Sequence, residues 1–281
     1  GASYLQLPLV RRAKELGHEV FCFAWDKDAI CKDMADHFFP ISITEKEEIL
    51  RECKAIGIDG ICTIASDVAA PTVAYVAERM KLNANRYASA CRANNKYEML
   101  NALSATGVPC PRYEMVTSTP DLNIDRWTYP LIVKPSDRSG SLGVAKVGNR
   151  KDLIPAVENA ISLSFKGEAI IEEFIEGREI SVEFISYHGK HYPLQITDKV
   201  TTESPHFVEL EHHQPADFPE EKFNEIYSLT EKSLKALGLT DGASHSEFRI
   251  TAEGKIVVME IGGRMGGDFI GSDLVKLSTG Y

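Results

Sequence analysis

Residues 257–268 read Val-Val-Met-Glu-Ile-Gly-Gly-Arg-Met-Gly-Gly-Asp, and they are the most informative stretch of the chain. The apolar start predicts a strand that carries Glu260, and the glycines that follow predict a turn that carries Arg264. A second carboxylate, Glu247, stands upstream, and residues 251–255 in between are typical of a hairpin turn. Because paired strands lie roughly 5 Å apart, both carboxylates can face one cavity. Two anionic oxygen ligands and a guanidinium suit Mg²⁺ bound to a nucleotide phosphate.

The composition limits the function classes. The chain has 281 residues, enough for two domains, and its hydrophobic (43%) and charged (26%) fractions are ordinary for a soluble globular protein. A net charge of −10 argues against a general nucleic-acid or membrane-surface role. No apolar run reaches the roughly 18 residues that span a bilayer, and we expect no signal peptide. The six cysteines include no C-x-x-C pair, which predicts buried free thiols and a cytoplasmic location.

Strands and helices alternate over the first 80 residues, which predicts a parallel sheet of the Rossmann kind. Because Gly1-Ala-Ser directly precedes a helical pattern, we expect a first strand before Gly1 and an unfilled slot beside the strand at 20–25. A dinucleotide site is the weaker alternative to a structural or substrate-lining domain, since only one glycine of the GxGxxG pattern is present. The expected helices span residues 5–16, 45–56 and 71–80, and the expected strands 20–25 and 60–65.

Two lysines precede segments that could bind phosphate. The polar residues 83–96 predict a linker into a helix over 95–106, and Lys96 at its start is unfavourable for the helix dipole unless an anion binds there. A strand that ends at Lys134 leads into the small-residue loop 136–143, whose backbone N–H groups could approach a phosphate. A surface lysine and a simple hairpin are the plain alternatives.

The next segment predicts two strands around Gly177. Between them, residues 172–175 could offer backbone groups to an adenine, and Glu179 could offer a carboxylate to ribose hydroxyls. The plain alternative is that these acidic residues are solvated strand positions.

Residues 190–218 are rich in histidine and are expected to be irregular. A substrate-recognition segment is favoured there over ordinary loop histidines. Zinc is disfavoured because His212 and His213 are adjacent and would point apart on a strand. An amphipathic helix over 223–237 then leads into the hairpin.

The order of these features resembles the ATP-grasp superfamily. The run Glu-Glu-Phe-Ile-Glu-Gly-Arg-Glu at 172–179 and the run Glu-Ile-Gly-Gly-Arg-Met-Gly-Gly at 260–267 follow the two lysines, as in that superfamily. The resemblance covers nearly the whole chain. It implies an α/β, Rossmann-like domain at 1–92, then an α+β ATP-grasp domain of two subdomains at 93–281, with the lid at about 112–170. The greatest similarity is to carboxylate–amine ligases that make dipeptides, with carbamoyl-phosphate-synthase-like proteins next.

The resemblance also implies roles for individual residues. Arg264 would be catalytic, and Glu247 and Glu260 would hold Mg²⁺ or Mn²⁺. The residues expected to bind ATP are Lys96, Lys134, Ser136, Ser139, Gly140, Ser141, Gly143, Glu172, Glu173, Phe174, Ile175 and Glu179. The residues expected at the substrates are His206, His213, His245 and Gly266.

The implied reaction activates a substrate carboxylate with ATP. An acyl phosphate forms, and an amine displaces the phosphate to give an amide. The expected partners are a small-molecule carboxylate and amine, with no nucleic acid and no membrane, and a homodimer is left open. The alternatives are carboxyphosphate chemistry as in carbamoyl-phosphate synthase or biotin carboxylase, a non-catalytic ATP-binding module and a nicotinamide oxidoreductase.

Two departures from the family pattern bear on this expectation. Many ATP-grasp enzymes have an asparagine two residues after the second glutamate, where this chain has Gly262, so a third protein ligand for the metal is missing. Two fully held Mg²⁺ ions are therefore less expected. The second departure is at the end of the chain, where we expect a further C-terminal subdomain after Tyr281.

Overall fold

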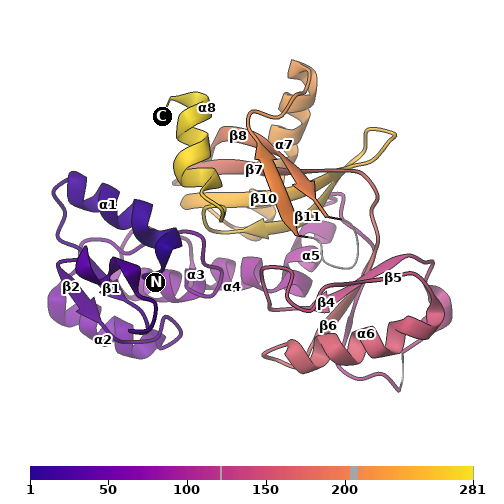
Figure 1. The fold of residues 1–281 in the computed structure, drawn as a ribbon, viewed down its shortest axis with the longest axis horizontal. Coiled ribbons are helices and arrows are strands. Elements are labelled where there is room, and N and C mark those ends of the chain that lie inside the picture. Colours follow the sequence, from indigo (N-terminus) through magenta and orange to yellow (C-terminus); the bar gives the residue numbers. More distant parts are fainter. Residues whose placement is uncertain (121, 203–207, 281) are drawn as a thin grey trace.

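The computed structural model describes residues 1–120, 122–202 and 208–280. Three parts are visible in Figure 1: an N-terminal part, a small sheet covered by helix α6, and a larger sheet backed by helices α5 and α7. Helices α4 and α5 run along the molecule between the first part and the two sheets (Figure 1). This arrangement agrees with the mixed α/β and α+β architecture that the resemblance implies.

The N-terminal part contains most of the predicted helices. Strands β1 and β2 form a parallel pair, with Phe21 opposite His37. The predicted helices at 5–16, 45–56 and 71–80 are confirmed within a few residues. The elements are η1 (Tyr4–Gln6), α1 (Leu7–Glu15), β1 (Phe21–Phe23), η2 (Ile30–Asp33), β2 (His37–Phe39), α2 (Lys46–Ile56), α3 (Ala70–Met80) and α4 (Tyr87–Asn94).

Two predictions for this part are wrong. Residues 60–65, all of them described, form no strand, and a cavity of about 580 Å³ lies between residues 58–63 and β1. A strand needs a neighbour for its ladder of hydrogen bonds, and the cavity separates the two segments. The expected linker at 83–96 contains helix α4, whose Tyr87 ring packs edge-on against Tyr75 of α3. The strand expected before Gly1 stays a prediction.

The small sheet has the order β3-β6-β4-β5, and all of its pairs are antiparallel. Helix α6 covers one face, where Leu153 and Val157 pack against Leu131 and Val133 of β4. The loop between β4 and β5 contains the small residues of 136–143, as predicted. The elements are β3 (Tyr113–Val116), η3 (Ile124–Arg126), β4 (Leu131–Pro135), β5 (Ala145–Val147), α6 (Arg150–Leu163) and β6 (Ala169–Glu173).

The larger sheet has the order β11-β10-β7-β8-β9 and is antiparallel throughout. The expectation that residues 190–218 are irregular is wrong, because β8 pairs with β7 and β9 then pairs with β8. The elements are α5 (Lys96–Ala105), β7 (Arg178–Tyr187), β8 (Lys190–Thr201), β9 (Glu209–His213), α7 (Glu220–Leu237), β10 (Gly242–Ile250), β11 (Ile256–Gly262), η4 (Ile270–Leu274) and α8 (Val275–Thr279).

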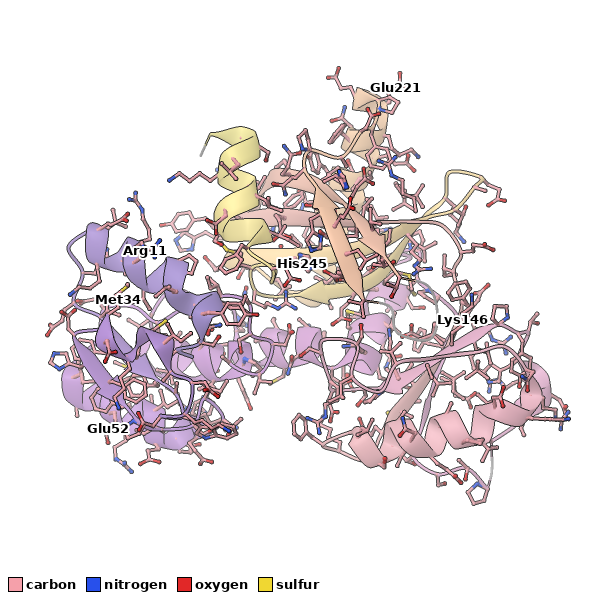
Figure 2. The ribbon with its side chains drawn as sticks, viewed as in Figure 1. Arg11, Met34, Glu52, Lys146, Glu221 and His245 are labelled. Carbon is pink, nitrogen blue, oxygen red and sulfur yellow. The ribbon has the colours of Figure 1, made fainter. Side chains whose placement is uncertain are left out.

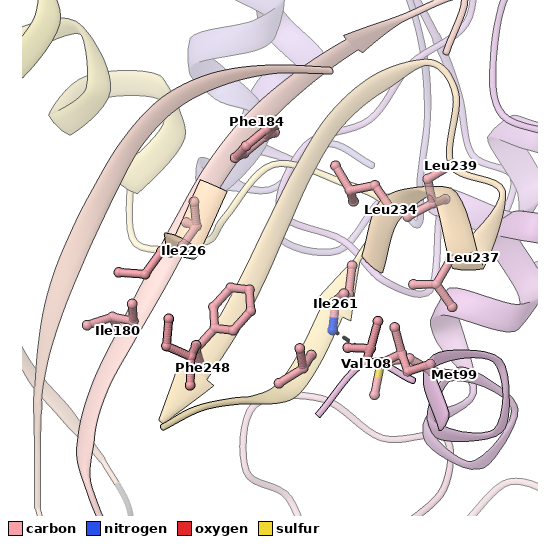
Figure 3. Packing of buried hydrophobic residues seen from close by; sticks show 14 of the residues in the cluster. Met99, Val108, Ile180, Phe184, Ile226, Leu234, Leu237, Leu239, Phe248 and Ile261 are labelled. Atoms are coloured by element: carbon pink, nitrogen blue, oxygen red, sulfur yellow. Dashed lines mark hydrogen bonds between the residues drawn. The ribbon is translucent and has the colours of Figure 1, made fainter. Parts of the chain in front are cut away.

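Helices α5 and α7 bury one face of this sheet (Figure 3). Phe248 of β10, Met99 of α5 and Leu234 of α7 are fully buried in this core. Burying side chains of this size stabilises a fold by roughly 1.5–3 kcal/mol each. The backbone N–H of Ile261 donates to the sulfur of Met99 at 3.2 Å, drawn as a dashed line in Figure 3. Alternate residues of the strands point to the opposite face, which is therefore available for polar side chains.

A β-bulge turns Glu260 toward that opposite face. Glu247 lies directly opposite Glu260, whereas the next pair is Phe248 with Val258, so Met259 is an extra residue on β11. Val258 is buried in the core, and strict alternation would send Glu260 into the core as well. The extra residue reverses the alternation, as bulges do. The predicted hairpin with two opposed carboxylates is thereby confirmed.

Gly177, between β6 and β7, is predicted to tolerate no side chain. A Cβ there would lie 2.3 Å from the carbonyl oxygen of Ile250 and 3.1 Å from the Cα of Thr251. Because both contacts are backbone, Gly177→Ala is expected to lower the free energy of unfolding by about 3 kcal/mol in urea titrations. Gly148→Ala is the matched control, since a Cβ at Gly148 meets no atom within 4 Å. Equal stability of the two variants would contradict the close approach.

All six cysteines are free. Cys22, Cys31 and Cys53 are buried as predicted, and burial raises the pKa of the Cys31 and Cys53 thiols to about 11. Cys62 is exposed, so the prediction of a buried thiol is wrong at that position. In the described part of the chain, every helix is too short or too polar to cross a membrane.

Candidate active site

A cleft lies where the polar face of the larger sheet meets the small sheet and the start of α5. Figure 2 shows His245 on the larger sheet, with the small sheet that carries Lys146 below it. The structure brings most of the predicted site residues together in the lining of this cleft. They are Lys96, Lys134, Ser139, Gly140, Ser141, Glu172, Phe174, Ile175, Glu179, His245, Glu247, Glu260 and Arg264.

Five other predicted residues are described but do not line the cleft: Ser136, Gly143, Glu173, His213 and Gly266. The hydroxyl of Ser136 is buried and donates to Glu168 at 2.9 Å. A Cβ on Gly143 would lie 2.8 Å from Leu163, so this glycine packs against α6. Glu173 and His213 are exposed at the ends of strands, and Gly266 is buried beneath His245. His206 lies outside the described residues.

The two predicted phosphate-binding lysines are buried in the cleft. The Nζ of Lys96 lies 2.9 Å from Glu260 Oε1 and donates to the carbonyl of Arg138 at 2.7 Å. Burial lowers the pKa of Lys96, but the carboxylate of Glu260 outweighs burial, and the pKa is raised overall. The Nζ of Lys134 lies 2.8 Å from Glu172 Oε2. The cleft therefore offers two ammonium groups close to the small-residue loop.

Lys199 of β8 is a further cation that was not predicted from the sequence. Its Nζ lies 2.6 Å from Glu209 Oε1 and 2.9 Å from Glu247 Oε1. The Oε1 of Glu179 lies 3.4 Å away, and the Lys199 side chain is 1% exposed. Burial lowers the pKa of Lys199, but the three carboxylates raise it overall. Burial raises the pKa of Glu209, whereas the hydrogen bond from His212 and the charge of Lys199 lower it to about 2.

His245 is buried between two carboxylates. Its Nδ1 is hydrogen-bonded to Glu183, and its Nε2 lies 3.3 Å from Glu247 Oε1. Burial lowers the pKa of His245, but Glu183 and Glu247 outweigh burial and raise the pKa to about 9. Glu183 also accepts the backbone N–H of Gly266 at 3.2 Å. The protonated imidazole thus links Glu247 to the glycine turn, and a substrate role for His245 stays a prediction.

Arg264 is held by a carboxylate from the N-terminal part. Its Nε donates to Asp67 Oδ1 at 2.7 Å, and a second guanidinium nitrogen donates to Oδ2 at 2.8 Å. Burial lowers the pKa of Arg264, but Asp67 outweighs burial and raises it. Asp67 was not predicted, because it lies in a loop far upstream with no local motif.

The comparisons with known proteins identify the family. A family model described as an ATP-grasp domain matches residues 127–273, which is more than half of the chain. The chain belongs to the ATP-grasp family. The matched region includes strands β4, β5 and β6 of the small sheet, the larger sheet and the paired glutamates of the hairpin. The predicted resemblance is confirmed.

Individual relatives of this ATP-grasp chain are ligases. The alanine–anticapsin ligase of Bacillus subtilis is 26% identical over 245 residues, which are 79% of this chain and 51% of that protein. The D-alanine–D-alanine ligase of Christiangramia forsetii is 29% identical over 167 residues, or 55% of this chain and 49% of that protein. The chain spans about half the length of the curated relatives it matches.

Solved structures extend the similarity to the N-terminal part. The crystal structure of an L-amino acid ligase from Bacillus licheniformis has a TM-score of 0.85 and 26% identity, and covers 100% of this chain and 70% of that one. A biotin carboxylase from Campylobacter jejuni has a TM-score of 0.79 at 19% identity, and covers 100% of this chain and 70% of that one. The likeness to the biotin carboxylase shows a shared fold.

The donor atoms of the ATP-grasp cleft fit a divalent cation. Oxygens of Glu209 and Glu247 converge on a single point that is now taken by the ammonium of Lys199, at 2.6 and 2.9 Å. Glu260 lies opposite Glu247 across the bulge. Carboxylate oxygens are the ligands that Mg²⁺ prefers in proteins, usually with waters and substrate phosphates completing the octahedron. Near the rim, ligand atoms of Glu209, His212 and Asp268 lie within 4.8 Å of one another.

Proposed function

We propose that this protein is an ATP- and Mg²⁺-dependent ligase that activates a substrate carboxylate as an acyl phosphate for attack by an amine. The observation that carries the proposal is the convergence, in one cleft, of buried lysines and opposed carboxylates. Lys96 and Lys134 suit phosphate binding, and Glu247 and Glu260 suit the metal. The similarity to ligases of amino acids supports an amide-forming reaction.

The residues of this chain would act by positioning the substrates and by stabilising negative charge. Lys96 and Lys134 would hold the phosphates. The adenosine would be held by Glu172, Phe174, Ile175 and Glu179. Arg264 would bind the transferred phosphoryl group and the developing negative charge, which is the main contribution expected in phosphoryl and acyl transfer. No protein nucleophile is needed, because holding the two substrates in line with the leaving phosphate lowers the barrier.

Glu247, Glu260 and Glu209 are the residues proposed to hold Mg²⁺ or Mn²⁺. When bound, the metal would neutralise charge on the phosphates. Glu209 is an addition to the two predicted ligands, and it offers the third carboxylate that Gly262 does not. Lys199 would then release these carboxylates and turn to the phosphates, since its ammonium cannot share their oxygens with a metal ion at the same point.

Two alternative functions can be distinguished from the proposed one by experiment. Carboxyphosphate chemistry is the first alternative, and the likeness to a biotin carboxylase, at 19% identity, shows a shared fold and does not distinguish it from amide formation. A non-catalytic ATP-binding module is favoured by Gly262, which offers no side-chain oxygen at the position where the family resemblance implies an asparagine ligand. The cytoplasmic location and the homodimer stay predictions.

The proposal is tested by ADP release with Mg-ATP across a panel of amino-acid pairs. We expect at least one pair to stimulate ADP release well above either amino acid alone, with an amide product identified by mass spectrometry. Carbamoyl phosphate as the product, with bicarbonate as the stimulating substrate, would support the rival chemistry. ATP binding without stimulated ADP release by any pair would favour the non-catalytic module.

A further inference from the structure

A charged side chain of the N-terminal part contacts Arg264, which lines the cleft. Asp67 lies in the loop before α3 and binds Arg264 with both carboxylate oxygens, at 2.7 and 2.8 Å. The Asp67 and Arg264 side chains are 17% and 15% exposed. Burial raises the pKa of Asp67, but the charge and hydrogen bonds of Arg264, together with the charges of Lys96 and His245, lower it overall, so Asp67 is ionised. Two parallel N–H···O bonds fix the plane of a guanidinium as well as its position.

The loop that carries Asp67 is itself held in place. The backbone N–H of Ala65 donates to the carbonyl of Met265 at 3.3 Å, so the loop contacts the glycine turn a second time. Ala65 has a φ of +52°, a left-handed conformation that costs an alanine roughly 1–2 kcal/mol. The amide of the buried Gln6 donates to the carbonyl of Ile64 at 2.9 Å. Backbone strain of this kind persists where surrounding contacts enforce it.

Gly262 makes room for this arrangement. A Cβ at Gly262 would lie 3.3 Å from Cζ of Arg264 and 3.4 Å from Oδ1 of Asp67. A longer side chain at this position would therefore compete with the ion pair for the same space. Gly262 and the carboxylate from the N-terminal part therefore belong to one local arrangement around Arg264.

We propose that Asp67 positions Arg264, and that the absence of a side chain at Gly262 leaves the space that this ion pair needs. The inference rests on the proposed function of the cleft. Asp67 holds Nε and one terminal nitrogen of the guanidinium, and the other terminal nitrogen donates to the carbonyl of Met265 at 3.2 Å. We expect this hold to present the N–H groups that are left to an anion in the cleft. The N-terminal part then completes the active site, and the Glu247–Glu260 hairpin with Arg264 is insufficient without it.

The direct test is the NMR signal of the Arg264 Nε–H group. Arg264→Lys removes this signal and so identifies it. In the full chain, the Asp67→Asn variant is expected to shift the signal markedly, because an amide oxygen replaces a charged acceptor. Asp67→Glu, which can restore a bidentate ion pair, is expected to recover it in part. Asp59→Asn, at an exposed aspartate of the same part, is expected to leave it unchanged.

The kinetic test separates positioning from folding. We expect Asp67→Asn to lower kcat by about 100-fold, because small displacements of a reacting group have effects of that size, with the KM for ATP changed less than about threefold. Asp67→Glu should restore part of the lost kcat. Gly262→Asn should lower kcat by a factor similar to that of Asp67→Asn. An unshifted Nε–H signal in Asp67→Asn, or an unchanged kcat, would overturn the inference. Absence of ADP release in the wild type would overturn the ligase proposal instead, and the NMR test would still decide the role of Asp67.

Discussion

Glu260→Ala and Arg264→Ala are each expected to abolish ADP release, with a loss of at least about 100-fold in kcat. Glu260 lies opposite Glu247 and binds Lys96 at 2.9 Å, so its removal takes a carboxylate from the proposed metal site and a partner from a lysine proposed to bind phosphate. In the proposed reaction, Arg264 would supply a buried positive charge to the transition state. The measurement is ADP release by a coupled assay with saturating Mg-ATP and the active amino-acid pair.

The fold should survive both substitutions. Glu260 and Arg264 lie on the polar face, outside the core packed against α5 and α7. Thermal unfolding of each variant should therefore stay cooperative, which separates lost chemistry from lost structure. Arg11→Ala is the matched control, because Arg11 is an exposed residue of α1. Full activity in either site variant would contradict the assignment of the cleft.

Lys199→Met is expected to lower the free energy of unfolding by about 3 kcal/mol in the absence of metal. The ammonium of Lys199 contacts Glu179, Glu209 and Glu247 within 3.4 Å. Removing it leaves three neighbouring carboxylates without their shared cation in a largely buried site. Because a divalent cation can replace the ammonium among these oxygens, Mg²⁺ should stabilise the variant more than it stabilises the wild type.

Urea titrations with and without Mg²⁺ measure both effects. Lys54→Met is the matched control, since Lys54 is exposed on α2, and surface changes of this kind usually alter stability by less than about 0.5 kcal/mol. If Mg²⁺ stabilised the Lys199 variant no more than the wild type, the three carboxylates would not form a cation site. A stable variant without metal would show that Lys199 does not hold them together.

The hairpin could be predicted from sequence because its signals are local. An apolar strand, a short turn and two carboxylates lie within residues 242–262, and the structure pairs Glu247 with Glu260. The bulge at Met259 could not be predicted. Simple alternation would have pointed Glu260 into the core with Val258, so its direction depends on how β11 meets β10.

Lys199, Glu209 and Asp67 lie outside any recognisable motif, and their place at the site was not predicted for a related reason. Lys199 and Glu209 lie in strands β8 and β9, in a histidine-rich region that was expected to be irregular. The alternation of Thr197, Lys199 and Thr201 was the available signal for a strand. Asp67 and Arg264 are 197 positions apart, so only the tertiary fold brings them together.

The N-terminal part illustrates the limit of periodicity. Helices α1, α2 and α3 were predicted correctly, because each helix forms its hydrogen bonds within itself. The segment 60–65 has the composition of a buried strand, but a strand forms its hydrogen bonds with a neighbour, and the cavity beside β1 leaves this segment without one. Composition alone cannot reveal whether that neighbour is present.

The most direct test of the account is a crystal structure of the full chain with Mn²⁺ and a non-hydrolysable ATP analogue. The account predicts an anomalous Mn²⁺ peak bound by Glu247 and Glu260, with Lys96 and Lys134 on the phosphates and Lys199 moved away from Glu247. Glu209 is expected to join the metal. A nucleotide bound elsewhere, or Mn²⁺ with no contact to Glu247 or Glu260, would contradict it.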